Sequence, residues 1–418
     1  MPCAVVRNPS ATQSRTLGGT GAWMQGAPLC QTAPVRSPYR GVAIVGAYNT
    51  KQARKLVGTS EAQLVLDAMR GTLRAAGLSP GDVDGLNVST WVTRLHSRAV
   101  AQWFGGRPAW TGIAVPGVEA VLEAAAAIAT GQCHTVLIAT AQCGEYTDRA
   151  ATVSWTRPGN EFVECWGLYT AAEFALMARR HMHLYGTRRE ALSEVAAAIR
   201  TNGARNPEAV MFGREIRPED VVASRLVADP FHLLDCCINS EGGCGLLLTT
   251  QERARDLDAT PVFVLGGALD RQGMAYVTAP VWDRYGEVGR RAARMSFEQC
   301  GLSPRDVDVA ELYDPFSFEI IRQLEAFGFC KEGEGGDFVM NGRIRMGGEL
   351  PVATNGGLLS FSHAGVVQML QKPVNAALQL QGRLPADLTV PDAKVVLASN
   401  GGSGALFSDV MLLGREPA

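Results

Sequence analysis

Short runs of apolar residues alternate with longer amphipathic stretches along most of the chain. The run GVAIVGA, residues 41–47, has the length and the small closing residues of a buried β-strand. The stretch EAQLVLDAMRGTLRAA follows and ends at Gly77, as an amphipathic helix with a glycine stop does. A new apolar run begins near Leu86. This region therefore predicts a strand, a helix, a turn and a second strand.

The same phrase returns late in the chain. AGLSPGDVD at 76–84 matches CGLSPRDVD at 300–308, an offset of 224 residues. The run VFVLGGALD and the helical stretch GRRAARMSFEQ precede the second copy, as a strand and a helix precede the first. The matched order around both turns indicates an internal duplication.

A further pair of segments extends the duplication. The Ala-rich stretch AVLEAAAAIATGQ leads into the strand pattern HTVLIAT, and AALQLQGRLPADLTVPDA leads into KVVLASN. Each half thus predicts a β-α-β-α-β unit. Apolar strands alternating with helices are typical of sheets covered on both faces, so the predicted fold class is α/β with two duplicated halves.

The pattern also sets the expected boundaries. Residues 1–38 are rich in Gly, Pro, Ser and Thr, contain no acid and show no apolar period, which is typical of a flexible tail. We expect an N-terminal half at 39–255, with an insertion at about 145–235, and a C-terminal half at 256–418. The insertion would form a lid over a site, or an arm used in packing or dimerisation.

Composition narrows the function classes. The chain has 418 residues and a net charge of -2, so no chain-wide field favours nucleic acid or an anionic membrane. No apolar run reaches the ~20 residues that a membrane span needs. The ten cysteines form no CxxC pair, which argues against a structural zinc site and suits a reducing cytosol. We expect a cytoplasmic protein without a metal.

Two loop segments carry candidate chemistry. ELYDPFSFEI places Tyr313 where an apolar run stops, and NGGLLSFSHAG places His363 after a Gly-Gly pair. With the segments VVASRLVADPFHLLDCCINSEGGCGLLLTT and LPVATNGGLLSFSHAG, these loops resemble the thiolase superfamily over residues 39 to about 416. The resemblance is to its lipid-transfer-protein branch, which contains the sterol-carrier-protein thiolases and the steroid side-chain aldolases.

The resemblance implies a layered α-β-α-β-α core and a set of site positions. Thiolases carry a nucleophilic cysteine before a long helix, where the helix N-terminus favours a thiolate; here Ala114 in TGIAVPGVEAVLEAA takes that position. The second family cysteine is replaced by Asn400 in LASNGGSG. The family histidine is kept as His363, whereas Tyr313 stands in the first oxyanion loop, as in the cysteine-less aldolases. Those aldolases have a second Tyr where this chain has His363.

Without a nucleophile no acyl-enzyme forms, and the predicted reaction is retro-aldol cleavage of a β-hydroxyacyl-CoA. We expect Tyr313 to act as the base, with His363 as an alternative base or as the acid that protonates the enolate. The N–H of Gly402 is a candidate oxyanion donor by family analogy, and Asn355 is expected to organise its loop. Two other readings stay open: a β-ketoacyl-CoA thiolase or acyltransferase subunit, and a non-catalytic acyl-CoA-binding scaffold.

The resemblance also implies partners. We expect a homodimer, and a small OB-fold protein with a zinc ribbon that assembles with it into a heterotetramer. The substrate is carried as a CoA thioester and no other cofactor is expected. Three arginines of the insertion are candidates for the CoA phosphates, with a solvated helix face as the alternative: Arg200, Arg205 and Arg214.

Overall fold

The computed structural model describes residues 37–90, 92–144, 170–272, 286–402 and 406–417. The predicted tail at 1–38 lies almost wholly outside the described residues, as does the first part of the insertion. In the part of the chain that the structure describes, no helix is long and apolar enough to cross a membrane.

The first half contains five strands of the main sheet, in the spatial order β3-β2-β4-β7-β1. They are β1 (Val42–Asn49), β2 (Gly85–Thr90), β3 (Trp110–Thr111), β4 (Thr135–Gln142) and β7 (Gly242–Thr250). β2 pairs in parallel with β3 and β4, whereas β7 runs antiparallel to β4 and β1. β7 is an additional strand beyond the predicted β-α-β-α-β unit.

The second half continues the sheet as β8-β11-β10-β9. Counted outward from the centre, this repeats the first-half order β1-β7-β4-β2. Its strands are β8 (Val262–Ala268), β9 (Val309–Glu311), β10 (Val395–Gly401) and β11 (Ser408–Gly414). A parallel bridge from Ala310 to Val352 stands where the first half has β3. β11 runs antiparallel to both neighbours, as β7 does. The duplication predicted from the repeated turn is therefore present in the topology.

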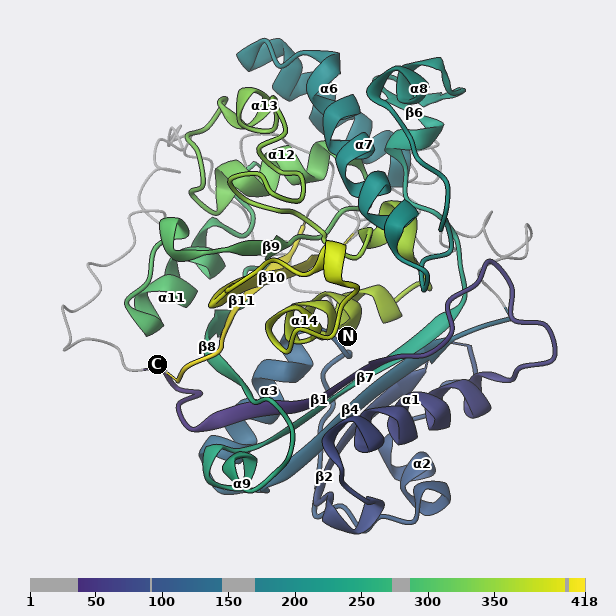
Figure 1. The fold of residues 1–418 in the computed structure, drawn as a ribbon, viewed down its shortest axis with the longest axis vertical. Helices are drawn as coiled ribbons and strands as arrows, with labels where there is room; N and C mark the ends of the chain where they lie inside the picture. The colour runs from purple at the N-terminus through teal and green to yellow at the C-terminus, as the bar shows by residue number, and fades with distance from the viewer. Residues whose placement is uncertain (1–36, 91, 145–169, 273–285, 403–405, 418) are drawn as a thin grey trace, which may run out of the picture. The chain divides into compact units, whose positions relative to one another are not determined.

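Matching helices follow the strands of each half (Figure 1). They are α1 (Glu61–Ala76) and α3 (Val118–Ala129) in the first half, and α11 (Arg290–Cys300) and α14 (Val367–Leu380) in the second. A capping box between Ser60 and Gln63 begins α1, and the left-handed residues Gly77 and Gly301 end α1 and α11. The repeated turns form the short 3-10 helices η1 (Pro80–Asp82) and η3 (Pro304–Asp306).

The strands alternate their side chains between two apolar cores. In β1, Ala43 and Val45 face the core that holds α1 and α11, whereas Val42 and Ile44 face the core that holds α3 and α14. Both α3 and α14 pack against strands of both halves. They therefore form the middle layer of the predicted α-β-α-β-α arrangement, and both faces of the strands are buried.

The half-sheets meet edge to edge, because β1 and β8 pair through two residue pairs, Ala43 with Phe263 and Ile44 with Val262. Two shorter helices belong to the first half: α2 (Ser97–Phe104) before β3, and α9 (Gln251–Arg255) after β7.

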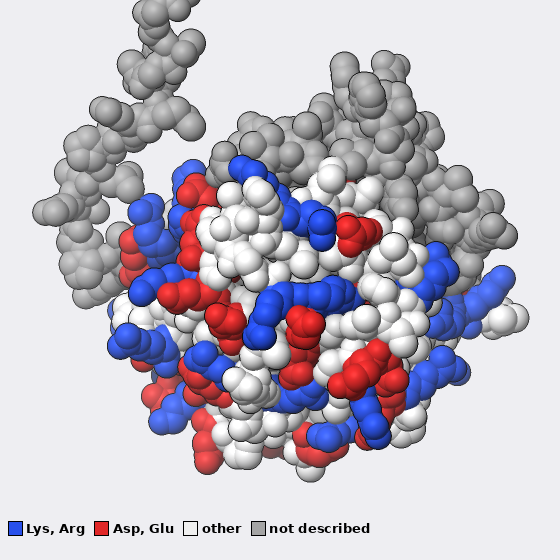
Figure 2. All heavy atoms as spheres, turned by 90° about the horizontal axis from the view of Figure 1, so that it is seen from above, with Lys and Arg blue, Asp and Glu red and all other residues white. Residues whose placement is uncertain are grey.

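The described part of the insertion covers the loops of the second half. It contains α6 (Thr170–Tyr185), α7 (Arg189–Arg205), α8 (Pro218–Ala223), the hairpin β5 (Leu226–Ala228) and β6 (Phe231–His232), and η2 (Leu233–Asp235). α7 packs on α12 (Ser317–Ala326) and on the π-helical turn η4 (Gly357–Phe361). Among the described residues, the remaining short helices are α13 (Gly335–Phe338) and η5 (Ala386–Leu388). Figure 2 shows Lys and Arg interspersed with Asp and Glu over the described part of the face above α6 and α13.

Candidate active site

Tyr313 lies two residues after β9, in the loop that leads to α12. Its N–H donates to Ser399 Oγ at 3.1 Å, and its carbonyl accepts from Gln323 Nε2 at 2.6 Å. The side chain is only 6% exposed, and a Cβ on Gly401 would lie 2.9 Å from its ring carbon Cδ1. The missing side chain at Gly401 therefore creates the space in which the phenol ring sits.

His363 follows η4 and is also 6% exposed. Its backbone pairs with Ser240: the His363 N–H donates to Ser240 Oγ at 2.7 Å, and the Ser240 N–H donates to the His363 carbonyl at 3.2 Å. Burial lowers the pKa of His363 to about 4; a hydrogen bond with the Ile238 backbone opposes this effect and the charge of Lys372 adds to it. His363 is therefore a neutral imidazole at pH 7.

The segment before β7 touches both loops. The N–H of Cys237 donates to the carbonyl of Pro315 at 2.9 Å, in the Tyr313 loop, and the N–H of Ile238 donates to the carbonyl of Leu358 at 3.1 Å, in η4. With Ser240 against His363, one extended stretch of the first half thus holds the two loops of the second half side by side.

Asn400 caps α3 from the other half of the molecule. Its Oδ1 accepts from the Val118 N–H at 2.7 Å, and its Nδ2 donates to Asp409 Oδ2 at 3.0 Å. Burial raises the pKa of Asp409 to about 6, although Arg271, at 2.9 Å, lowers it. A side-chain amide thus meets the first N–H of the helix that carries the nucleophile in thiolases.

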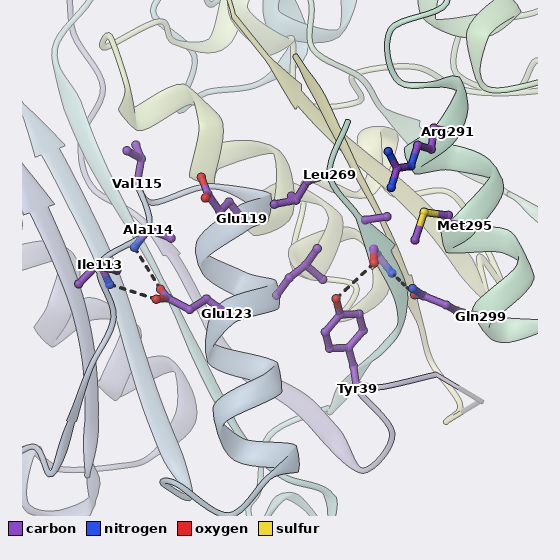
Figure 3. A pocket seen from close by; sticks show the side chains of 13 residues that line it. Tyr39, Ile113, Ala114, Val115, Glu119, Glu123, Leu269, Arg291, Met295 and Gln299 are labelled. Carbon is purple, nitrogen blue, oxygen red and sulfur yellow. Dashed lines mark hydrogen bonds between the residues drawn. The ribbon is translucent and has the colours of Figure 1, made fainter. Parts of the chain in front are cut away.

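Ala114 lies four residues before the start of α3. It lines a pocket of about 660 Å³ together with Ile113, Val115 and side chains of α3 and α11 (Figure 3). The Ala114 N–H donates to Glu123 Oε2 at 3.1 Å. Within the described residues, this pocket does not include Tyr313 or His363.

The other two predicted positions, Asn355 and Gly402, both lie in closely packed loops. Asn355 Oδ1 accepts from the Gly357 N–H at 2.9 Å, and the Asn355 carbonyl accepts from Asn206 Nδ2 at 3.0 Å, just past α7. Asn355 therefore joins the His363 loop to the insertion. A Cβ on Gly402 would lie 2.1 Å from Phe407 Cε1, so a larger residue there would require the Phe407 ring to move. The role of Gly402 as an oxyanion donor stays a prediction.

The structure corrects one phosphate-binding candidate. Arg200 is buried, and its guanidinium donates to the carbonyls of Leu234 and Cys236, both at 2.9 Å. Burial also lowers its pKa to about 10. The expectation that Arg200 meets CoA phosphates is wrong, because its donors hold the backbone after β6; Arg205 and Arg214 are exposed.

The described cysteines are poorly suited to nucleophilic chemistry. Burial raises the pKa of Cys236 to about 12 and that of Cys143 to about 11, and it raises the pKa values of Cys237 and Cys244 as well. These thiols stay protonated at neutral pH, and the thiolate is the reactive form. Among the described residues, no group of three His, Cys, Asp or Glu side chains could hold a metal ion.

Comparison with known proteins places this site in a family. A family model described as "Thiolase C-terminal domain-like" matches residues 283–415. A steroid side-chain-cleaving aldolase from Thermomonospora curvata is 33% identical over 381 residues, 84% of this chain and 93% of that protein. A 17-hydroxy-3-oxo-4-pregnene-20-carboxyl-CoA lyase from Mycobacterium tuberculosis is 37% identical over 338 residues, 77% of this chain and 87% of that one.

Solved structures agree. An Ltp2-ChsH2(DUF35) aldolase superposes with a TM-score of 0.77 at 31% identity and covers 90% of this chain and 98% of that chain. The chain therefore belongs to the thiolase superfamily, in the branch of the side-chain-cleaving aldolases and the sterol-carrier-protein thiolases. Within that branch it is an enzyme of the carbon–carbon lyase class.

Proposed function

We propose that this protein cleaves a β-hydroxyacyl-CoA by a retro-aldol reaction without a covalent intermediate. The observation that carries the proposal is the hydrogen bond at the N-terminus of α3, where Asn400 Oδ1 accepts from the Val118 N–H. Asn400 stands where thiolases have their second cysteine, so no thiol lies at that position. The names of the relatives support the same reaction: one is a side-chain-cleaving aldolase and another a carboxyl-CoA lyase.

The steps need a base, a stabilised enolate and an acid. Tyr313, acting as a phenolate, removes the proton of the β-hydroxyl group and becomes a phenol. The oxygen lone pair then forms a carbonyl at the β-carbon, and the bond between the α- and β-carbons breaks. The bonding electrons pass to the thioester as an enolate, which takes up a proton at the α-carbon. The products are a ketone or aldehyde and a shortened acyl-CoA.

We assign His363 to the thioester side of this reaction. With a pKa of about 4 it is neutral at pH 7, so it donates a hydrogen bond to the enolate oxygen, or delivers a proton, as an imidazole and not as a cation. A base with so low a pKa has little driving force to take the proton of an alcohol. This favours Tyr313 as the base.

The substrate and the assembly are part of the proposal. The carboxyl-CoA lyase relative is named for a steroid thioester, which supports a steroid or similarly bulky acyl chain here. The related aldolase structure contains a DUF35 protein, which supports the expected small OB-fold partner. We also propose a homodimer built through the open edge at β3, and a cytoplasmic location, which suits the free thiols of the described cysteines.

The test is an assay with a steroid β-hydroxyacyl-CoA, following the ketone and the shortened acyl-CoA, with and without a coexpressed DUF35 partner. Tyr313→Phe and His363→Ala should each lower kcat by ~10² or more with unchanged thermal unfolding. Tyr48→Phe and His134→Ala serve as controls, because neither side chain lies in the two loops. Full activity of both site variants would refute the assignment. Rapid thiolysis of a β-ketoacyl-CoA would favour an acyltransferase. If neither substrate were turned over, a non-catalytic scaffold would be favoured.

A further inference from the structure

Asp314, the neighbour of Tyr313, is a buried carboxylate bound to the other catalytic loop. Its oxygens accept from the Leu358 N–H at 3.0 and 2.9 Å and from the Leu359 N–H at 3.2 Å. Both donors belong to η4, which ends at Phe361, two residues before His363. One side chain thus connects the loop of Tyr313 to the turn that carries His363.

The approach of this carboxylate depends on Gly357. A Cβ there would lie 2.2 Å from Asp314 Oδ2, and Gly357 also has a φ of +52°. No residue with a side chain fits both constraints. The Gly-Gly pair that marked this loop in the sequence is therefore the place where the carboxylate enters the π-helical turn.

Lys372, on α14, completes the arrangement. Its Nζ lies 2.5 Å from Asp314 Oδ1, and the side chains of the pair are 3% and 0% exposed. Lys372 is also the charged side chain that acts on the pKa of His363 in the described part of the chain.

Burying such a pair is costly. Replacing a buried ion pair by apolar residues of similar size is often neutral or stabilising, so the pair is weak evidence for stability alone. The Asp314–Lys372 pair lies between the two loops that carry the proposed catalytic groups, so it can affect how these groups are arranged.

We propose that Asp314 and Lys372 are positioning residues that fix the imidazole of His363 relative to the phenol of Tyr313. Asp314 sets the separation of the two loops through its bonds to η4, and Lys372 holds the carboxylate in the orientation that these bonds require. The inference rests on the proposed function, because it assigns the pair to the same site.

The experiment uses the full chain, coexpressed with the proposed DUF35 partner. Asp314→Asn combined with Lys372→Met removes both charges together, so that no unpaired buried charge is left. Lys372→Met is also tested alone. We expect kcat to fall by about tenfold or more, with KM changed less than threefold, because substrate contacts are kept while the two reacting groups lose their alignment.

A second readout separates positioning from general damage. Removing the Lys372 charge should raise the pKa of His363, since a nearby positive charge disfavours protonation. The acid limb of the kcat/KM profile, and the imidazole titration followed by NMR, should both move upward by about 0.5 to 1 pH unit. The matched control is the double variant Glu319→Gln and Arg322→Met. It removes a pair within α12 whose side chains are just as buried, at 2% and 1% exposure.

The outcomes are distinct. An unchanged kcat and an unmoved imidazole titration in a folded Lys372→Met protein would overturn the inference, as would the same effects in the control pair. The imidazole titration needs no substrate, so it tests the pair even if turnover is absent. If Tyr313→Phe and His363→Ala kept full activity, the proposed function would fail instead, and the titration of His363 in Lys372→Met would still test the effect of the pair on the imidazole.

Discussion

Glu173 illustrates how a single buried group couples stability to pH. It lies on α6, fully buried, and neither carboxylate oxygen has a hydrogen-bond partner in the described part of the chain. Burial alone raises its pKa to about 7. Since the folded-state pKa exceeds the unfolded one, the contribution of Glu173 is fully present below about pH 4.5 and is lost as the pH rises through 7.

We therefore predict that Glu173→Gln changes stability in a pH-dependent way. Between pH 4.5 and pH 8 the free energy of unfolding of the wild type should fall, relative to the variant, by about 3 kcal/mol, from a pKa difference worth ~1.4 kcal/mol per unit. Denaturant unfolding at several pH values measures the difference. Glu190→Gln, on the exposed side of α7, should show no such trend, and a difference independent of pH would contradict the prediction.

Residue roles were predictable only where a motif carries them. Tyr313 stands out because it lies where an apolar run stops, and His363 because it follows a Gly-Gly pair. Lys372 and Arg200 carried no such signal. Each is a basic residue in a helical pattern, and nothing local reveals that Asp314 reaches Lys372 across 58 residues or that the carbonyl of Leu234 folds back on Arg200.

At the scale of elements, the packing of α7 on η4 joins the insertion to the His363 loop. Gly203 makes the contact possible, because a Cβ there would lie 2.1 Å from Ser360 Oγ and 2.4 Å from Ser360 Cβ. The backbone after α7 continues the contact: the N–H of Val210 donates to the carbonyl of Phe361 at 2.9 Å. The insertion is thus bonded to the turn that precedes His363.

Gly203→Ala should separate the two elements. Alanine favours a helix over glycine by about 1 kcal/mol. The overlap with Ser360 should outweigh this gain, so that the free energy of unfolding falls by about 1–3 kcal/mol, as is usual for overpacking. The rate of aldol cleavage should fall together with the stability. Adding Ser360→Gly removes the overlapping atoms and should restore both quantities. Thermal unfolding and turnover of the single and double variants measure this, with Thr201→Ala as control; failure of the rescue would count against this contact.

Local elements were the most predictable part of the fold. The Ser-Pro-x-Asp turns at Ser79 and Ser303 appear as the same 3-10 turn with the same bonds, Ser79 N–H to Asp82 at 2.9 Å and Ser303 N–H to Asp306 at 2.8 Å. These bonds join residues that are three apart in the sequence, so each turn forms from local residues. The π-helical form of η4 was not predictable, because it depends on a carboxylate from Asp314.

For the whole molecule, the apolar pattern predicted two α/β halves but not how they join. β7 and β11 contain near-continuous apolar runs like the parallel strands, and the direction of such a strand depends on its partners. The seam between β1 and β8 involves two residue pairs and leaves no mark in the sequence. The predicted halves at 39–255 and 256–418 contain the two sets of strands, and their limits stay a prediction.

The open edge of the first half gives a prediction about assembly. β3 ends the sheet, and just after it Ile113 is 93% exposed and Val115 47% exposed. In the proposed homodimer these side chains would be buried by the second copy. Ile113→Asp should therefore shift the protein toward monomers in sedimentation, because a buried unpaired carboxylate is costly. Val57→Asp, at a loop residue that is 85% exposed, is the control. An unchanged dimer in Ile113→Asp would contradict this interface.

The amide of Asn400 on the end of α3 also bears on ancestry. Restoring a sulfur atom at position 114 alone would not recreate the two cysteines of a thiolase, because position 400 in the other half holds Asn400, whose Oδ1 accepts from the Val118 N–H at the start of α3. A route back would have to alter both repeats at once. The two positions where thiolases carry a thiol thus lie in different duplicated halves, as Ala114 and Asn400, so a single substitution would not reverse the change of chemistry.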